Sequence, residues 1–112
     1  MALQKTYANI LGVVLLVLGV WGFIQKPLIL SLFGINVYQN ILHLIGGALG
    51  VWKGGKTFNL WLGWIALIVG ILGYVPGASD LLIQIFGINT TISVLHIVVG
   101  IISLGVAYGV KE

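Results

Sequence analysis

Long apolar runs separated by short polar segments dominate the chain. Four of these runs approach the length of a membrane-spanning helix, which needs about 20 mostly apolar residues. They are Tyr7 to Ile24, Tyr38 to Trp52, Thr57 to Val75 and Thr90 to Tyr108. Aromatic residues lie near the ends of the runs, as they do at the two interfaces of a bilayer. The pattern predicts an all-α fold: an integral membrane four-helix bundle in one domain, residues 1–112.

Two shorter apolar connections separate the first run from the second and the third from the fourth. They are Lys26 to Phe33 and Gly77 to Phe86. Their leucines and isoleucines favour short helices that lie in the membrane interface. Asp80 or Ser79 is expected to cap the second of these helices.

The tetrapeptide Phe-Gly-Ile-Asn follows each connection, and it is typical of a helix stop followed by a helix start. Gly34 and Gly87 are expected to end the short helices in the left-handed conformation. Asn36 and Asn89 are then the predicted N-caps of the next spans. Gln39 is placed to complete a capping box with Asn36.

The chain contains an internal repeat, with copies at about residues 7–53 and 57–110. In its first part, Leu11, Gly12, Leu16, Gly19 and Gly22 correspond to Leu62, Gly63, Leu67, Gly70 and Gly73. In its second part, Phe33 to Asn36, Leu42, His43 and Gly47 correspond to Phe86 to Asn89, Leu95, His96 and Gly100. Each copy holds two runs, so both copies enter the membrane in the same direction. The repeat predicts a duplicated helical hairpin with a pseudo-twofold axis along the membrane normal.

The composition excludes an ordinary soluble domain. Only 6% of the residues are charged and 60% are apolar, whereas a soluble domain has about 25% charged residues. The net charge of +3 comes from scattered lysines, so we expect the lipid bilayer and no nucleic acid as a partner. Most lysines fall on the side of the two termini, which the positive-inside rule places in the cytoplasm: Lys5, Lys53, Lys56 and Lys111, against Lys26 on the other side.

The segment Phe33 to Asn36, followed by Leu42, His43 and Gly47, resembles the bacterial four-helix membrane family known as domain of unknown function 4383. The family often has a histidine at the position of Gln39. The resemblance implies a four-span protein of the cytoplasmic membrane of a prokaryote, of uncharacterised activity. It supplies no catalytic residues.

Polar and small residues form one stripe on the second span and the same stripe on the fourth. The stripes are Asn36, Asn40, His43, Gly47 and Gly50, and Asn89, Ser93, His96, Gly100 and Ser103. Helical spacing places each set on one face. A polar stripe is costly against lipid, so we expect both to face the bundle interior.

These stripes have two competing interpretations. The first is structural, with His43 and His96 hydrogen-bonded to Asn40 or Ser93 and with the glycines permitting close packing. The second is a ligand site, above all a bis-histidine haem b on His43 and His96, with Gly47 and Gly100 leaving room for the macrocycle. The sequence also leaves open that the two histidines bind another pigment or ligand, or that they form a proton relay. A closed zinc site is not expected, because it needs four ligands.

No constellation for enzyme chemistry is apparent, so a non-enzymatic structural or interaction subunit is the predicted function. Gly50 to Thr57 matches the P-loop pattern, yet it falls in a turn between two spans and predicts no nucleotide binding. Small-residue grooves on the first and third spans suggest a homo-oligomer or a larger membrane complex. Their glycines are Gly12, Gly19, Gly22, Gly63, Gly70 and Gly73.

Overall fold

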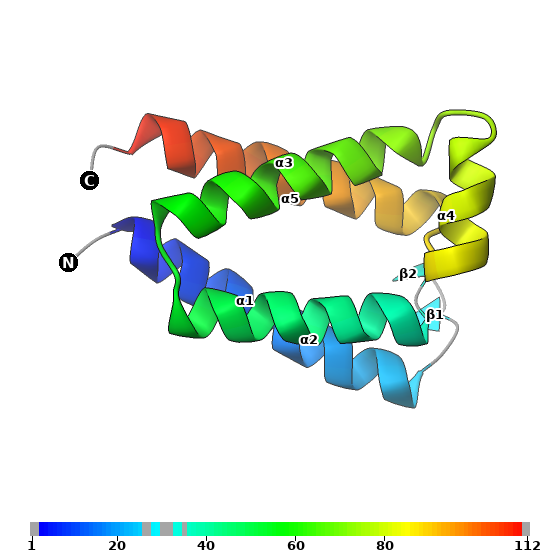
Figure 1. Cartoon of the computed structure of the whole chain (residues 1–112), viewed down its shortest axis with the longest axis horizontal. Coiled ribbons are helices and arrows are strands. Elements are labelled where there is room, and N and C mark those ends of the chain that lie inside the picture. The colour runs from blue at the N-terminus through cyan, green and yellow to red at the C-terminus, as the bar shows by residue number, and fades with distance from the viewer. Residues whose placement is uncertain (1–2, 26–27, 30–32, 35, 111–112) are drawn as a thin grey trace.

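A computed structural model describes residues 3–25, 28–29, 33–34 and 36–110 of the chain. Its elements, in order, are α1 (Leu3–Ile24), β1 (Leu28–Ile29), β2 (Phe33–Gly34), α2 (Val37–Trp52), α3 (Lys56–Leu72), α4 (Ala78–Phe86) and α5 (Thr90–Gly109) (Figure 1). The described part of the chain is therefore helical apart from one pair of two-residue strands. All four predicted apolar runs are helical, although the third ends at Leu72 rather than at Val75.

The four long helices lie as two antiparallel pairs. Helix α1 packs along α2, and α3 packs along α5, while contacts between the pairs are much fewer. We call α1 with α2 the first hairpin, and α3 with α5 the second. Helix α1 begins and α5 ends at the same end of the molecule, and α4 lies across the opposite end (Figure 1).

Glycines bring the two helices of each hairpin into backbone contact. A Cβ atom built on Gly47 would lie 2.6 Å from the carbonyl oxygen of Gly12, and one built on Gly12 would lie 2.7 Å from that of Gly47. In the second hairpin, a Cβ atom on Gly100 would lie 2.6 Å from the backbone nitrogen of Leu67. No side chain fits between such backbones, which is how small residues allow helices to approach closely.

The described interior is small and unusually polar. Its fully buried side chains with the largest volume are Asn40, Asn59, Ser93 and Ser103. Large apolar side chains such as Val17, Ile68 and Ile101 lie on the outside and are half exposed or more. This is the reverse of a soluble protein, where Ile, Val and Leu are the residues most often buried.

The predicted helix from Lys26 to Phe33 is wrong for the part of the connection that the structure describes. Leu28 pairs with Gly34 and Ile29 with Phe33 in an antiparallel strand pair. This pairing satisfies backbone groups between two segments rather than within one. Gly34 is consequently part of a strand and not the end of a helix, and Lys26 lies outside the described residues.

The second connection is helical, as predicted, but it begins differently. Gly77, with φ of +87°, is the N-cap of α4, and no side chain caps this end. The prediction of Ser79 or Asp80 as the cap is wrong, because both lie within the first turn. An acidic residue in the first turn, here Asp80, interacts favourably with the positive end of the helix dipole. Gly87 ends α4 in the left-handed conformation with φ of +69°, as predicted.

Replacing Gly47 with alanine should weaken the first hairpin. The new methyl group would meet the backbone of α1, which cannot move aside as a flexible side chain can. Overpacking of this kind costs about 1–3 kcal/mol, which unfolding in detergent would measure. The matched control is Gly105→Ala on α5, where nothing lies within 4 Å of the added carbon. That control should be neutral or stabilising by up to about 1 kcal/mol, and an equal loss in both variants would contradict the packing role.

Candidate functional site

Two asparagines fix where α2 and α5 begin. The side-chain oxygen of Asn36 accepts a hydrogen bond from the backbone nitrogen of Gln39 at 3.0 Å. Asn89 accepts one from the backbone nitrogen of Ile92, also at 3.0 Å. His43 and His96 each follow their cap by seven positions, about 10 Å along the helix. The two caps therefore place the histidines at corresponding depths in the two hairpins.

The structure brings His43 and His96 together across the boundary between the hairpins. Their ring centroids lie 6.4 Å apart, and the ring planes make an angle of 74°. The Nδ1 atom of each ring is buried and has no hydrogen-bond partner. Two nitrogen atoms that could donate, accept or ligate are thus held in the interior without a protein partner.

Asn40 and Ser93 occupy matching positions one turn before the two histidines. Asn40 is fully buried, and neither its amide nitrogen nor its amide oxygen has a hydrogen-bond partner. The Ser93 hydroxyl donates to the backbone oxygen of Asn89 at 3.0 Å. The hydrogen bonds that the structural interpretation expects, from histidine Nδ1 to Asn40 or Ser93, are therefore not formed.

Gly47 and Gly100 lie on the same helices as the histidines but face their own hairpin. Gly47 contacts the backbone of α1 at Gly12 and Leu16, and Gly100 contacts that of α3 at Leu67. The expectation that they leave room for a macrocycle beside the histidines is wrong. Their lack of a side chain serves the close approach of two helices.

Gln4 and Asn59, which the sequence analysis did not single out, form a buried hydrogen-bonded contact between the hairpins. The Asn59 amide donates to the side-chain oxygen of Gln4 at 2.9 Å and to its backbone oxygen at 3.0 Å. The Gln4 amide donates to three carbonyl oxygens at the end of α5, at 2.9–3.2 Å: those of Val106, Ala107 and Val110. Both side chains are buried, at 2% and 0% exposure. For Asn59, the available signal was a polar residue inside the apolar run from Thr57 to Val75; Gln4 precedes the first run and gave no such signal.

Further polar contacts lie on both sides of the histidines: one joins α1 to α5, and two join the start of α2 to α4. Tyr7 and Ser103 share a hydrogen bond of 2.6 Å between their hydroxyl groups, on the side of the Gln4 contact. At the opposite end, Asn36 donates to the backbone oxygen of Ile85 at 2.8 Å. Gln39 donates to that of Phe86 at 2.9 Å, which differs from the capping box predicted for it. The histidine pair thus lies between the hydrogen bonds of α1 with α5 at one end and those of α2 with α4 at the other.

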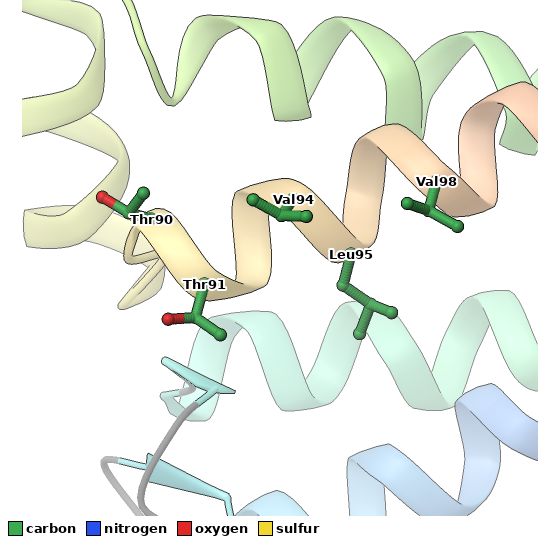
Figure 2. Close-up of a pocket in the computed structure, with 5 residues that line it drawn as sticks. All are labelled: Thr90, Thr91, Val94, Leu95 and Val98. Carbon is green, nitrogen blue, oxygen red and sulfur yellow. The ribbon is translucent and has the colours of Figure 1, made fainter.

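Two grooves on the outer surface are apolar and contain neither histidine. One, of about 350 Å³, lies along the start of α5, where Thr90, Thr91, Val94, Leu95 and Val98 line it (Figure 2). The other, of about 400 Å³, lies on α1 and is lined by Leu16, Val17, Val20, Trp21 and Ile24. Neither offers the converging polar groups of a site for a polar small molecule.

The segment from Gly50 to Thr57 joins two helices. Helix α2 ends at Trp52, with Lys53 as its C-cap, and α3 begins after Gly55. A nucleotide-binding P-loop instead joins a strand to a helix. The ammonium group of Lys53 lies 4.8 Å from the centre of the Trp52 ring, a cation–π contact.

Comparison of the chain with protein-family models, curated proteins and solved structures finds no match. The resemblance to domain of unknown function 4383 therefore stays a prediction from the residues around His43 and His96. Among the described residues, no group of three or more histidine, cysteine, aspartate or glutamate side chains could hold a metal ion by itself.

Replacing Asn59 with leucine should loosen the contact between the hairpins. The change removes both hydrogen bonds to Gln4 and leaves its buried side-chain oxygen without this donor. Such a loss costs about 1–3 kcal/mol, measurable as a lower midpoint of unfolding in detergent. A double-mutant cycle with Gln4→Leu should be strongly non-additive, because the side chains contact each other. Gln84→Ala, on the exposed side of α4, is the control and should leave the midpoint unchanged. If the stability losses of Asn59→Leu and Gln4→Leu simply add in the double variant, the pairing is contradicted.

Proposed function

We propose that this chain is an integral membrane protein whose four long helices all span the bilayer. The distribution of side chains carries this proposal, because apolar groups cover the outside while the buried groups are small or polar. In a bilayer, polar side chains within a span are expected to face the interior of the bundle. Two helices are long and apolar enough to cross, α1 with 22 residues and α5 with 20.

The two shorter helices fit the same arrangement. Helix α2 has 16 residues and α3 has 17, which gives about 24–26 Å at 1.5 Å per residue. Aromatic and basic side chains lie near the end where α2 meets α3, where they suit the headgroup region. Examples are Trp52 with Lys53, and Trp64, whose ring nitrogen donates to the Tyr108 hydroxyl at 3.3 Å.

The proposal includes a duplication of one helical hairpin. Corresponding residues make corresponding contacts: a Cβ atom on Gly19 would meet the backbone oxygen of Asn40, and one on Gly70 would meet that of Ser93. Gly47 likewise faces the backbone of Leu16, and Gly100 that of Leu67. With both copies inserted in one direction, the lysine distribution favours cytoplasmic termini. The resemblance to domain of unknown function 4383 implies the cytoplasmic membrane of a prokaryote.

The function that these features favour is that of a non-enzymatic subunit acting through contacts within the membrane. The glycines expected to offer grooves on the first and third spans are not available for this role. Gly12, Gly19, Gly63 and Gly70 all contact the partner helix of their own hairpin. An outward small-residue face remains on α5, where open space surrounds the Cβ positions of Gly105 and Gly109, one turn apart. This spacing suits close helix packing in a bilayer.

Single cysteines should reveal the proposed topology, because the natural chain contains none. In sealed cells, a membrane-impermeant maleimide should label Asp80→Cys from outside. It should reach Lys5→Cys and Lys56→Cys only after the cells are opened. Val17→Cys, in the middle of α1, should resist labelling in both cases because it would face lipid. Labelling of Lys5→Cys and Asp80→Cys from the same side would contradict the arrangement.

The interaction role predicts an assembly larger than one chain. The mass of the protein in lipid nanodiscs should exceed that of one 12.0 kDa chain, and Gly105→Leu should reduce it by filling the open face of α5. Gly55→Leu is a control, because its Cβ position is equally open but lies in the turn before α3. A wild-type protein that is strictly monomeric and free of partners would contradict this role.

A further inference from the structure

The end of the molecule where α1 begins carries a positive charge that no nearby acid balances. Lys5 on α1, Lys53 at the end of α2 and Lys56 at the start of α3 are all exposed. The described residues contain a single acid, Asp80, and it lies in α4, at the opposite end (Figure 1). Within the described part of the chain, no carboxylate therefore neutralises these three lysines, which we call the lysine patch.

Helix packing brings Lys5 and Lys56 to the same end of the molecule. Lys5 follows Gln4, whose backbone oxygen accepts a hydrogen bond from the Asn59 amide at 3.0 Å. Lys56 precedes Asn59 by three residues, which is almost one turn of α3. Both α1 and α3 begin at this end (Figure 1). Lys56 therefore lies about one turn further out than the contact between Gln4 and Asn59, and Lys5 adjoins that contact in the chain.

The turn between α2 and α3 adds Lys53 to the lysine patch. A Cβ atom built on Gly54 would lie 2.8 Å from the Cβ atom of Ala8, so this turn packs against the first part of α1. Lys53 and Lys56 are three residues apart, and at most about 11 Å separates their Cα atoms. Two of the three ammonium groups can therefore contact a single phosphate group.

Exposed aromatic side chains lie at the same end as the lysine patch. Trp52, Trp61 and Tyr108 are 65–75% exposed, and tryptophan and tyrosine prefer the depth of the lipid headgroups. The Lys53 ammonium lies 4.8 Å from the centre of the Trp52 ring. An ammonium group has three N–H donors, so this contact is compatible with a hydrogen bond to a phosphate oxygen. The aromatic residues thus favour a lipid phosphate over a soluble polyanion as the partner.

We propose that the lysine patch binds the headgroup of an anionic phospholipid, in the leaflet on the side where α1 begins. The proposal rests on the proposed membrane embedding, which places the patch at the level of the lipid phosphates. Lysines close to an anionic membrane surface attract its headgroups, each by about fivefold in affinity, equal to about 1 kcal/mol. At the opposite end the carboxylate of Asp80 repels the same headgroups, so the preference belongs to one side of the membrane.

Lipid binding by the purified full chain in mild detergent tests the proposal. Native mass spectrometry would measure the affinities for phosphatidylglycerol, which is anionic, and for phosphatidylcholine, which is zwitterionic, with identical acyl chains. We expect phosphatidylglycerol to bind at least about tenfold more tightly. Lys53→Gln and Lys56→Gln should each lower its affinity about fivefold and leave that of phosphatidylcholine unchanged. The double variant Lys53→Arg/Lys56→Arg keeps both charges and should keep the preference.

Two controls separate a local site from attraction by the net charge. Asp80→Asn raises the net charge by one at the opposite end, so it should not change the affinity for phosphatidylglycerol. A rise of about fivefold in this variant would assign the binding to net charge and overturn the proposal. Inorganic phosphate should displace no more lipid than sodium chloride does at the same ionic strength, since both only screen the charges. Stronger displacement by phosphate would make the free anion the ligand and also overturn the proposal.

The wild type and a variant without the patch decide the outcome. Equal affinity of the wild type for the two lipids would overturn the proposal, as would an unchanged preference in the triple variant Lys5→Gln/Lys53→Gln/Lys56→Gln. Circular dichroism of every variant reports whether the helices remain folded. Cysteine labelling reports membrane insertion whatever the lipid preference. Absence of the preference therefore leaves the topology result intact, whereas failure to insert contradicts the proposed function itself.

Discussion

The need to place polar side chains inside a protein with an apolar exterior determines most of this structure. In the proposed membrane setting, the bilayer is as apolar as leucine, so burial of large apolar groups would not drive helices together. The chain instead joins the helices of each hairpin through glycine backbones and joins the two hairpins through hydrogen bonds. Gln4 and Asn59 show the second mechanism, since both are buried and each satisfies groups of the other hairpin. The large apolar residues are consequently free to face outward.

Local signals in the sequence were sufficient for the long helices. Apolar length identified them, and Asn36 and Asn89 marked where two of them begin. The two connections were harder, because a short apolar segment fits a helix as well as a strand. Glycine at positive φ starts and ends α4 at Gly77 and Gly87, whereas the described residues of the first connection pair as β1 and β2. Whether a short apolar segment becomes a helix or a strand depends on its contacts with the rest of the protein. The local sequence pattern does not specify those contacts.

The candidate site was predictable to the extent that it depends on helical register. The repeat places His43 and His96 at equal depth, and the structure brings them to 6.4 Å. The direction of Gly47 and Gly100 was not predictable, because a stripe of about 80° on a helix can face two neighbours at once. Gln4 and Asn59 were missed for a related reason. They are 55 positions apart, and their pairing depends on how the hairpins meet, which the periodicity of one helix does not specify.

The proposed duplication explains why the contacts within and between hairpins differ in kind. Under the alignment that matches Gly12 with Gly63, Asn59 corresponds to Ala8, and Gln4 to Gly55. Ala8 and Asn59 are both fully buried, yet only Asn59 donates hydrogen bonds across the interface. The glycine contacts are therefore common to both copies, while the polar contact exists once. Two identical hairpins would contact each other through the same residues. A Gln–Asn contact that is made only once therefore favours the association of two hairpins that differ at these positions. Divergence at these positions thus stabilises the arrangement in which His43 of one copy faces His96 of the other.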